Sequence, residues 1–303
     1  MTQKEHLKRL PEFVRELVLE SSDKDRLKYL NDRPVFIKHN KYKKLEKKLD
    51  ELLYMPESNR IRSLLLVGNS NNGKTEMVLK YQEERNNLDI ESDDIQYNVM
   101  YIQSTNRASI HELYDSIFME LTVPYSKNES IVEREQKIKY YFDRFGIKML
   151  IIDEIQNALI GSITKQKEFM AGIKNLSNIL KKPIVLIGTP KGVSLVYNDH
   201  QLKSRFVPTK INNWKFDKDY LSLLASIELI LPLKKPSLVY KNEKFAREIL
   251  ELSDGLIGDI MTIMQLLAKY AIENGDEQIK KSMLSKIDYI PAYEREGTYA
   301  DEI

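Results

Sequence analysis

Short apolar runs alternate with longer segments of helical periodicity over the first 215 residues of the chain. Each run has the length of a strand that is buried on both faces, and polar or turn-forming residues flank it. This alternation is typical of an α/β domain with a mainly parallel sheet and helices around it. The predicted strands are Ser63–Val67, Asn98–Gln103, Lys148–Ile152, Pro183–Ile187 and a short one near Phe206–Ile211.

Segments with apolar residues at helical spacing predict the helices of this domain. Ser109 and Glu112 have the spacing of a capping box at the start of one helix, and Gly146 stops the next. Four helices are predicted at Glu76–Tyr81, Ser109–Leu121, Glu129–Phe145 and Lys165–Leu180. An earlier amphipathic helix has an apolar face made of Tyr42, Leu45, Leu49, Leu52 and Leu53.

After Trp214 the pattern predicts helices and no further strand. These helices span Asp217–Leu231, Asn242–Ser253, Gly258–Glu273 and Asp276–Ile287, with Gly255 and Asn274-Gly275 as stops. We therefore place a domain boundary near residue 215. The expected parts are an N-terminal extension at 1–40, the α/β domain at 41–215, a small helical lid domain at 216–290 and a polar tail at 291–303.

The composition is that of a folded protein with a sizeable core. The chain has 303 residues, 42% of them apolar and 30% charged. It has no cysteine, which excludes disulfides and cysteine-based zinc sites, and its four histidines lack metal-ligand spacing. No apolar run approaches the length of a membrane span, and the N-terminus lacks the apolar segment of a signal peptide. We therefore expect a cytoplasmic protein with no membrane contact.

Positive charge is concentrated near the N-terminus, although the net charge is only +2. The first 50 residues carry 14 Lys and Arg against 9 Asp and Glu. Much of the excess comes from Lys38, Lys41, Lys43, Lys44, Lys47 and Lys48, on the outer face of the amphipathic helix. Such a face is either simply solvated or contacts nucleic-acid phosphates.

The segment Gly68-Asn69-Ser70-Asn71-Asn72-Gly73-Lys74-Thr75 fits the P-loop pattern, between a predicted strand and a predicted helix. A loop in this position points backbone N–H groups inward, and the helix dipole adds positive charge, so that the loop can hold phosphates. Lys74 is expected to reach the β- and γ-phosphates of ATP, and the Thr75 hydroxyl to bind Mg²⁺. Glu76 completes the predicted nucleotide-binding segment. The alternative is a chance match in a glycine-containing turn.

Two acidic residues, Asp153 and Glu154, follow the buried strand that lies about 80 residues downstream of the P-loop. Ligands of open α/β sheets bind at the carboxyl ends of such strands. Asp153 is expected to orient Mg²⁺, and Glu154 to polarise the water that attacks the γ-phosphate. Acids also end strands for no functional reason, but the pairing with a P-loop indicates an ATPase, or at least an ATP-binding switch.

Two further residues are candidates for the catalytic site. Thr189 follows the strand Pro183–Ile187, and its hydroxyl can touch the attacking water or the γ-phosphate; the alternative is an ordinary strand-ending turn. Arg205 precedes the last strand, far from its own P-loop. It is therefore expected to act in trans, on the γ-phosphate of a neighbouring subunit, unless it is merely a surface arginine.

The order of these motifs resembles an AAA+ ATPase, and within that class the TniB/TnsC-type transposition regulators. The similar segments are Arg33-Pro34-Val35-Phe36-Ile37 through Pro56 and Arg60 into the P-loop, Leu150 to Asn157, and Ile187-Gly188-Thr189. The resemblance implies an ATP-dependent protein that forms a ring or helical filament on double-stranded DNA. It further implies recruitment of a DDE transposase and, in some systems, a TniQ-type target-selection partner.

One feature departs from the AAA+ pattern. These proteins commonly carry a sensor arginine near the start of a lid helix, whereas this chain has Asp259 there, with Arg247 as the nearest lid arginine upstream. Slow, switch-like hydrolysis is compatible with this departure. Two other functions remain open: another DNA-associated AAA+ ATPase, such as a helicase loader or replication initiator, and a small-molecule kinase with the same P-loop.

The DNA surface is expected on cations of the α/β domain that contact phosphates without reading bases. The candidates lie between the second strand and the Asp153 strand and are Arg107, Lys127, Arg134, Lys137 and Lys139. The alternative for this region is a solvated helix on which Lys137 and Lys139 pair with Glu133 and Glu135. In that case Lys41–Lys48 becomes the more plausible DNA surface.

Overall fold

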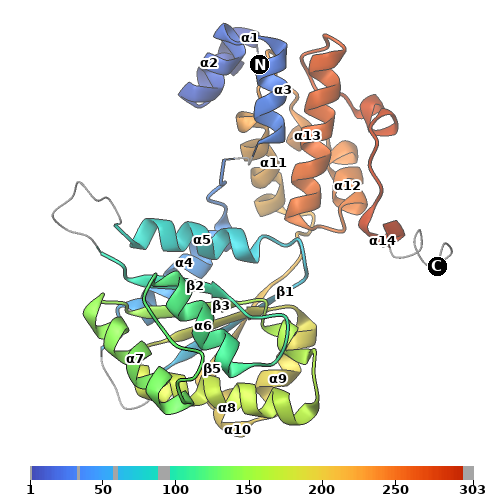
Figure 1. Cartoon of the computed structure of the whole chain (residues 1–303). Helices are drawn as coiled ribbons and strands as arrows, with labels where there is room; N and C mark the ends of the chain where they lie inside the picture. Colours follow the sequence, from blue (N-terminus) through green and yellow to red (C-terminus); the bar gives the residue numbers. More distant parts are fainter. Residues whose placement is uncertain (1, 33–34, 57–60, 88–95, 296–303) are drawn as a thin grey trace. The chain divides into compact units, whose positions relative to one another are not determined.

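The computed structural model describes residues 2–32, 35–56, 61–87 and 96–295. Within these ranges the chain forms two compact units (Figure 1). The α/β unit spans Lys41–Asn212, and the helical unit combines Met1–Asn40 with Asn213–Ile303. Three residues that carried the family resemblance, Arg33, Pro34 and Arg60, lie outside the described residues, as do residues 296–303 of the expected tail.

The α/β unit is built on a five-stranded sheet in which all neighbouring strands are parallel. This confirms the predicted sheet, since each strand lies within one residue of its expected limits. The strand order is β2-β3-β4-β1-β5. The strands are β1 (Ser63–Gly68), β2 (Val99–Gln103), β3 (Met149–Asp153), β4 (Ile184–Gly188) and β5 (Phe206–Ile211).

The strand order decides which loops meet at the carboxyl edge of the sheet. Strand β4 lies between β1 and β3, with Val67 opposite Gly188 and Ile152 opposite Leu186. The loops after these three strands therefore lie next to one another. All residues of β1, β3 and β4 are buried, which is why these strands appear in the sequence as continuous apolar runs.

Helices cover both faces of the sheet (Figure 1). On one face, α6–α8 pack on Leu65, Leu150 and Leu186 in a single apolar core. Helices α4 and α5 lie over the other face. The helices of this unit are α4 (Asn40–Leu53), α5 (Lys74–Arg85), α6 (Ile110–Glu120), α7 (Ile131–Arg144), α8 (Ile163–Leu180), α9 (Val193–Tyr197) and α10 (His200–Arg205), with 3₁₀ turns η1 (Ile155–Leu159) and η2 (Pro190–Gly192).

The capping box predicted at the start of α6 is only half formed. The Ser109 hydroxyl accepts a hydrogen bond from the Glu112 backbone N–H at 3.3 Å, as expected for an N-cap. The Glu112 carboxylate instead pairs with Arg107 Nε at 2.8 Å. A nearby cation therefore takes the place of the backbone donor.

The helical unit joins the two ends of the chain. Helix α3 packs against α13 (Figure 1), and Leu30 belongs to the same apolar core as Leu224 and Ile263. The N-terminal helices were not predicted from the sequence. The unit contains α1 (Gln3–Arg9), α2 (Glu12–Glu20), α3 (Asp23–Asn31), α11 (Lys218–Ile230), η3 (Val239–Lys241), α12 (Glu243–Leu252), α13 (Ile257–Glu273), η4 (Lys281–Lys286) and α14 (Ala292–Arg295).

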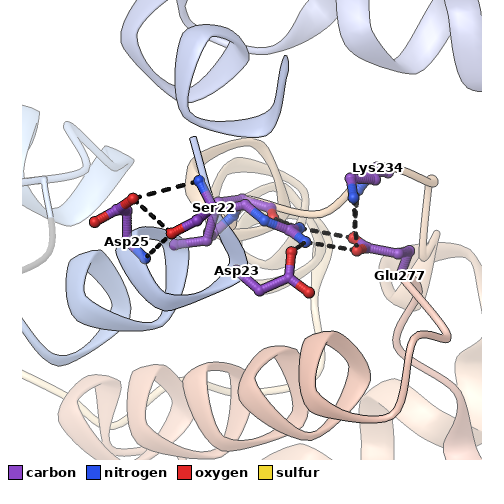
Figure 2. Close-up of polar contacts among 7 residues, drawn as sticks. Ser22, Asp23, Asp25, Lys234 and Glu277 are labelled. Carbon is purple, nitrogen blue, oxygen red and sulfur yellow. Dashed lines mark hydrogen bonds and ion pairs between the residues drawn. The ribbon is translucent and has the colours of Figure 1, made fainter. Parts of the chain in front are cut away.

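The α-helix predicted at Asp276–Ile287 is wrong, because this segment forms only the 3₁₀ turn η4. Glu277 has a φ of +57°, which is incompatible with a right-handed helix. Its carboxylate accepts two hydrogen bonds from the fully buried Arg26, at 2.6 and 2.8 Å, and lies 3.3 Å from Lys234 Nζ (Figure 2). A buried ion pair to a distant helix thus overrides the local helical pattern.

Within the described part of the chain, no helix is both long enough and apolar enough to cross a membrane.

Candidate nucleotide-binding site

The P-loop segment connects β1 to α5 through a tight turn. Gly73 precedes α5 with a φ of +74°, a conformation that glycine adopts without strain, and Asn71 has a φ of +57°. At Gly68 a Cβ atom would lie 2.9 Å from the carbonyl oxygen of Ile211 in the neighbouring strand. The glycine therefore lets the loop leave the sheet beside β5.

Lys74 lies inside this loop, with only 6% of its surface exposed. Its Nζ donates a hydrogen bond to the carbonyl oxygen of Asn69 at 2.8 Å, within the P-loop itself. Burial lowers the pKa of Lys74, and the negative charges of Asp153 and Glu154 oppose that shift. The ammonium group is thus a partly desolvated cation beside two carboxylates.

Asp153 is fully buried at the end of β3, and three donors converge on its carboxylate. The Thr75 hydroxyl donates at 2.6 Å, the Tyr101 hydroxyl at 3.2 Å, and the Glu154 backbone N–H at 2.7 Å. Burial and the charge of Asp153 raise the pKa of Tyr101 to about 12, so this hydroxyl keeps its proton. The hydroxyl and carboxylate oxygens of Thr75 and Asp153 are ligands that suit Mg²⁺.

Glu154 adopts a left-handed backbone conformation, with φ +57° and ψ +38°, directly before η1. Such a conformation costs a non-glycine residue on the order of 1 kcal/mol and is concentrated at functional sites. The side-chain amide of Gln156 donates a hydrogen bond to the Glu154 carboxylate. The Gln156 side-chain oxygen accepts a hydrogen bond from the Thr189 backbone N–H at 3.1 Å. Glu154 and Thr189 are therefore linked through one side chain.

The Thr189 hydroxyl is buried and has no hydrogen-bond partner among the described residues. Buried hydroxyls usually have a partner, so this one has an unused capacity to donate and to accept. It lies at the edge of the sheet where Thr75 and Asp153 meet, because β4 runs between β1 and β3. The structure thus brings together the P-loop, Asp153, Glu154 and Thr189.

Arg205 lies at the amino ends of the strands, opposite the carboxyl ends where the P-loop lies. It ends α10, immediately before Phe206, which pairs with Ser63 at the start of β1, whereas the P-loop follows the far end of that strand. Its guanidinium donates to the side-chain oxygen of Asn178 at 2.6 Å. The chain does not bring this arginine to its own P-loop.

The family model for the bacterial TniB protein matches residues 26–216, which is more than half of the chain. The chain belongs to the TniB family. Among curated proteins, no match to this TniB-family chain was found.

Solved structures show that the fold is that of a P-loop AAA+ ATPase. ORC2 of Aeropyrum pernix, in complexes with ADPNP and ADP, has a TM-score of 0.60 at 12% identity, over 89% of this chain and 74% of that chain. Cdc6p of Pyrobaculum aerophilum has a TM-score of 0.58 at 16% identity, over 83% and 67%. ORC1 of A. pernix, in complex with DNA, has a TM-score of 0.52 at 15% identity, over 86% and 68%.

Most of the cations predicted to contact DNA in this TniB-family chain have acidic partners. Arg107 pairs with Glu112, Lys137 Nζ lies 2.6 Å from Glu129, and Lys139 Nζ lies 2.7 Å from Asp143. The expected alternative partners are engaged elsewhere: Glu133 bonds to Ser130, and Glu135 accepts from the Tyr114 hydroxyl. Lys127 is exposed, with no ion pair recorded among the described residues.

Arg134 was wrongly placed on the surface. Its side chain is 1% exposed and forms an ion pair with Asp115. It also donates to the backbone oxygens of Ser126 and Glu129. The guanidinium holds the loop before α7 and is not accessible to DNA.

The basic face of α4 has fewer internal partners. Two of the acids on this helix are occupied by Arg85 of α5, which lies 3.1 Å from Glu46 and 2.7 Å from Asp50. Lys43, Lys44 and Lys47 are exposed, and no ion pair within 4 Å is recorded for them among the described residues. Among the described residues, these three lysines therefore have no ion pair to give up when they bind a phosphate.

In the helical unit, Asp259 is buried at the start of α13. It accepts hydrogen bonds from the Tyr289 hydroxyl at 3.0 Å and from Arg295 at 2.7 Å. Arg247 pairs with Glu243, and its guanidinium lies 3.7 Å from the centre of the Phe216 ring. Asp259, which stands where AAA+ proteins commonly carry the sensor arginine, thus holds the C-terminal segment through these contacts.

Two residues of the site, Tyr101 and Gln156, were not predicted from the sequence as functional residues. Tyr101 lies on β2, two residues before the position that pairs with Asp153, so its side chain reaches the end of the neighbouring strand. Gln156 stands two residues after Glu154, in a segment noted only for its family resemblance. The polar pair Gln156-Asn157, between apolar residues directly after the acidic pair, was the signal that could have identified Gln156.

Proposed function

We propose that this TniB-family protein is an ATP-dependent DNA-binding regulator of transposition. In this proposal it binds ATP and Mg²⁺ at the P-loop, assembles on duplex DNA as a ring or filament, and recruits or activates a DDE transposase. The observation that carries the nucleotide part is the convergence of Thr75 and Tyr101 on the buried Asp153, with Glu154 beside it. Family membership supports the transposition part.

Each residue of the site has a separate role in the proposed hydrolysis of ATP. Lys74 exchanges its contact with the Asn69 carbonyl for phosphate oxygens, which are stronger acceptors for a buried ammonium group. Thr75 and Asp153 would hold Mg²⁺, which would neutralise charge on the phosphates. Glu154 accepts a proton from the attacking water. The unpartnered Thr189 hydroxyl orients that water or the terminal phosphate.

Arg205 acts in this proposal on the ATP of a neighbouring subunit. Its place at the opposite edge of the sheet from its own P-loop supports a role in trans. A site completed by a second subunit makes hydrolysis depend on assembly. The Asn178 side chain, on α8, holds the guanidinium in the isolated chain and would release it to a phosphate.

Duplex DNA is bound, we propose, by the basic face of α4 formed by Lys43, Lys44 and Lys47. The internal ion pairs of Arg107, Lys137 and Lys139 favour this surface over the one between β2 and β3. A cation that already has a carboxylate partner gains less from a phosphate, because it must give up that partner. The ORC1 protein, which is similar in fold to this chain, has been solved in complex with DNA.

The alternative is another DNA-associated AAA+ ATPase, such as a helicase loader or replication initiator, and the likeness to ORC and Cdc6 proteins favours considering it. A strand-transfer assay with a DDE transposase separates the two. We expect ATP and this protein to stimulate strand transfer, and Lys74→Ala to abolish the stimulation. Stimulation of helicase loading without any effect on strand transfer would favour the alternative.

A further inference from the structure

Gln156 bridges two residues that the proposed ATP hydrolysis uses. Its amide nitrogen donates to one oxygen of the Glu154 carboxylate, and its amide oxygen accepts from the Thr189 backbone N–H at 3.1 Å. For the other carboxylate oxygen of Glu154, no hydrogen bond is recorded among the described residues. One oxygen of the acid is therefore held, and the second is available to a water molecule.

The end of β4 is shaped to admit this side chain. A Cβ atom at Gly188 would lie 2.8 Å from the Gln156 side-chain oxygen and 2.6 Å from Ile155 Cγ2. Such distances are too short for any larger residue to fit without displacing the side chains of Ile155 and Gln156. The glycine before Thr189 thus lets η1 pack directly against the strand that carries Thr189.

Glu154 needs such support because its own backbone is strained. A left-handed glutamate, with φ +57°, has no preference for this conformation and is held there by its surroundings. The backbone N–H of Glu154 is held by Asp153 at 2.7 Å, and its side chain by Gln156. Without the second contact the carboxylate is free to rotate.

We propose that Gln156 is a positioning residue that orients Glu154 and couples it to Thr189. The two groups then meet the attacking water as one unit, and a shift of Thr189 on nucleotide binding moves Glu154 with it. This inference rests on the proposed ATP hydrolysis. It predicts that Gln156 influences turnover mainly through the position of the Glu154 carboxylate.

The test compares Gln156→Met with Gln166→Met. Methionine preserves the length of the side chain and removes both hydrogen bonds. Gln166 also supports this region, donating to the backbone oxygens of Leu159 and Gly161, but it does not contact Glu154. We expect Gln156→Met to lower kcat for ATP at least about tenfold with KM within about twofold of the parental value, because a misplaced base costs rate more than binding. Gln166→Met should retain the parental kcat.

A double mutant then distinguishes positioning from a general structural effect. In single-turnover measurements, Gln156→Met should add no further loss in a Glu154→Gln background. A second variant, Gln156→Glu, keeps an acceptor for the Thr189 N–H but places a carboxylate that repels Glu154 where the amide donated to it, and it should be at least as impaired as Gln156→Met. This variant also carries the test if Gln156→Met does not fold.

Two outcomes would overturn the positioning role: a parental kcat in both Gln156 variants, or the same fold-loss with and without Glu154. If the parental protein turned over no ATP, the proposed hydrolysis itself would fail. If the parental protein, Gln166→Met and both Gln156 variants all hydrolyse ATP with the same kcat, only the positioning role fails.

Discussion

At the scale of single residues, the nucleotide site depends on contacts between side chains that belong to different strands. The P-loop and the Asp153-Glu154 pair could be predicted because each is a local pattern in a fixed context. The hydrogen bond from Tyr101 to Asp153 and the one from the Thr189 N–H to Gln156 could not, because both depend on which strands become neighbours. The prediction that Arg134 is accessible to DNA was wrong for a similar reason, since its ion-pair partner Asp115 is on another helix.

Glu228 provides a residue-scale prediction about pH. It is buried on α11, where its carboxylate accepts from the backbone N–H groups of Leu238 and Tyr240. Burial raises its pKa to about 7, from 4.5, and the backbone hydrogen bonds only partly oppose the shift. The folded state therefore binds this proton more tightly than the unfolded state. Its contribution to stability is most favourable below pH 4.5 and is lost as the pH rises to about 7.

Glu228→Gln removes this titration and keeps an acceptor for the N–H groups. We expect it to match the parental stability near pH 4.5 and to exceed it above pH 7, by roughly 3 kcal/mol or less. Urea unfolding at several pH values measures the difference. Glu251→Gln, on the exposed surface of α12, is the control and should show no pH-dependent gain. A constant difference between Glu228→Gln and parent across this range would contradict the argument.

At the scale of elements, the strands were predictable and part of the helical unit was not. A strand buried on both faces is apolar throughout, so its sequence alone identifies it. The segment Asp276–Ile287 has helical periodicity, but Arg26, 251 positions away, binds Glu277 in a non-helical turn. Helices α1–α3 complete the same unit by packing on its C-terminal helices, which a pattern read along the chain does not show.

Helix α4 provides the prediction at this scale. Replacing Lys43 and Lys47 with alanine should weaken binding to unrelated duplex sequences about equally. It should also reduce the slope of log K against log salt concentration by about 1.8, the value for two phosphate contacts. Anisotropy titrations of labelled duplexes at several salt concentrations measure both quantities.

The matched control replaces Lys137 and Lys139, which lie on α7 and have acidic partners. This pair of substitutions should leave the salt slope unchanged. If the α7 variant loses slope and the α4 variant does not, the DNA surface lies between β2 and β3, as first expected from the sequence.

At the scale of the whole molecule, Arg205 and the P-loop lie at opposite ends of the strands of one sheet, which supports the proposal that two subunits share an ATP site. Arg205→Ala and Glu154→Gln subunits should each be nearly inactive in ATP turnover. Mixing them should restore part of the activity, because some interfaces combine an intact Arg205 with an intact Glu154. A mixture that stays inactive at high protein concentration would count against a shared site.

The central claim is that ATP binding at the P-loop controls assembly on DNA, and duplex binding in different nucleotide states tests it most directly. Anisotropy of a labelled duplex of arbitrary sequence is measured with ATP, with ADP and without nucleotide. We expect tight DNA binding only with ATP. In Glu154→Gln the ATP-dependent DNA complex should last longer, because ATP turnover falls by about 10²-fold or more. Lys74→Ala should not bind DNA tightly in any state. Equal DNA affinity in all three nucleotide states, or parental affinity in Lys74→Ala, would contradict the account.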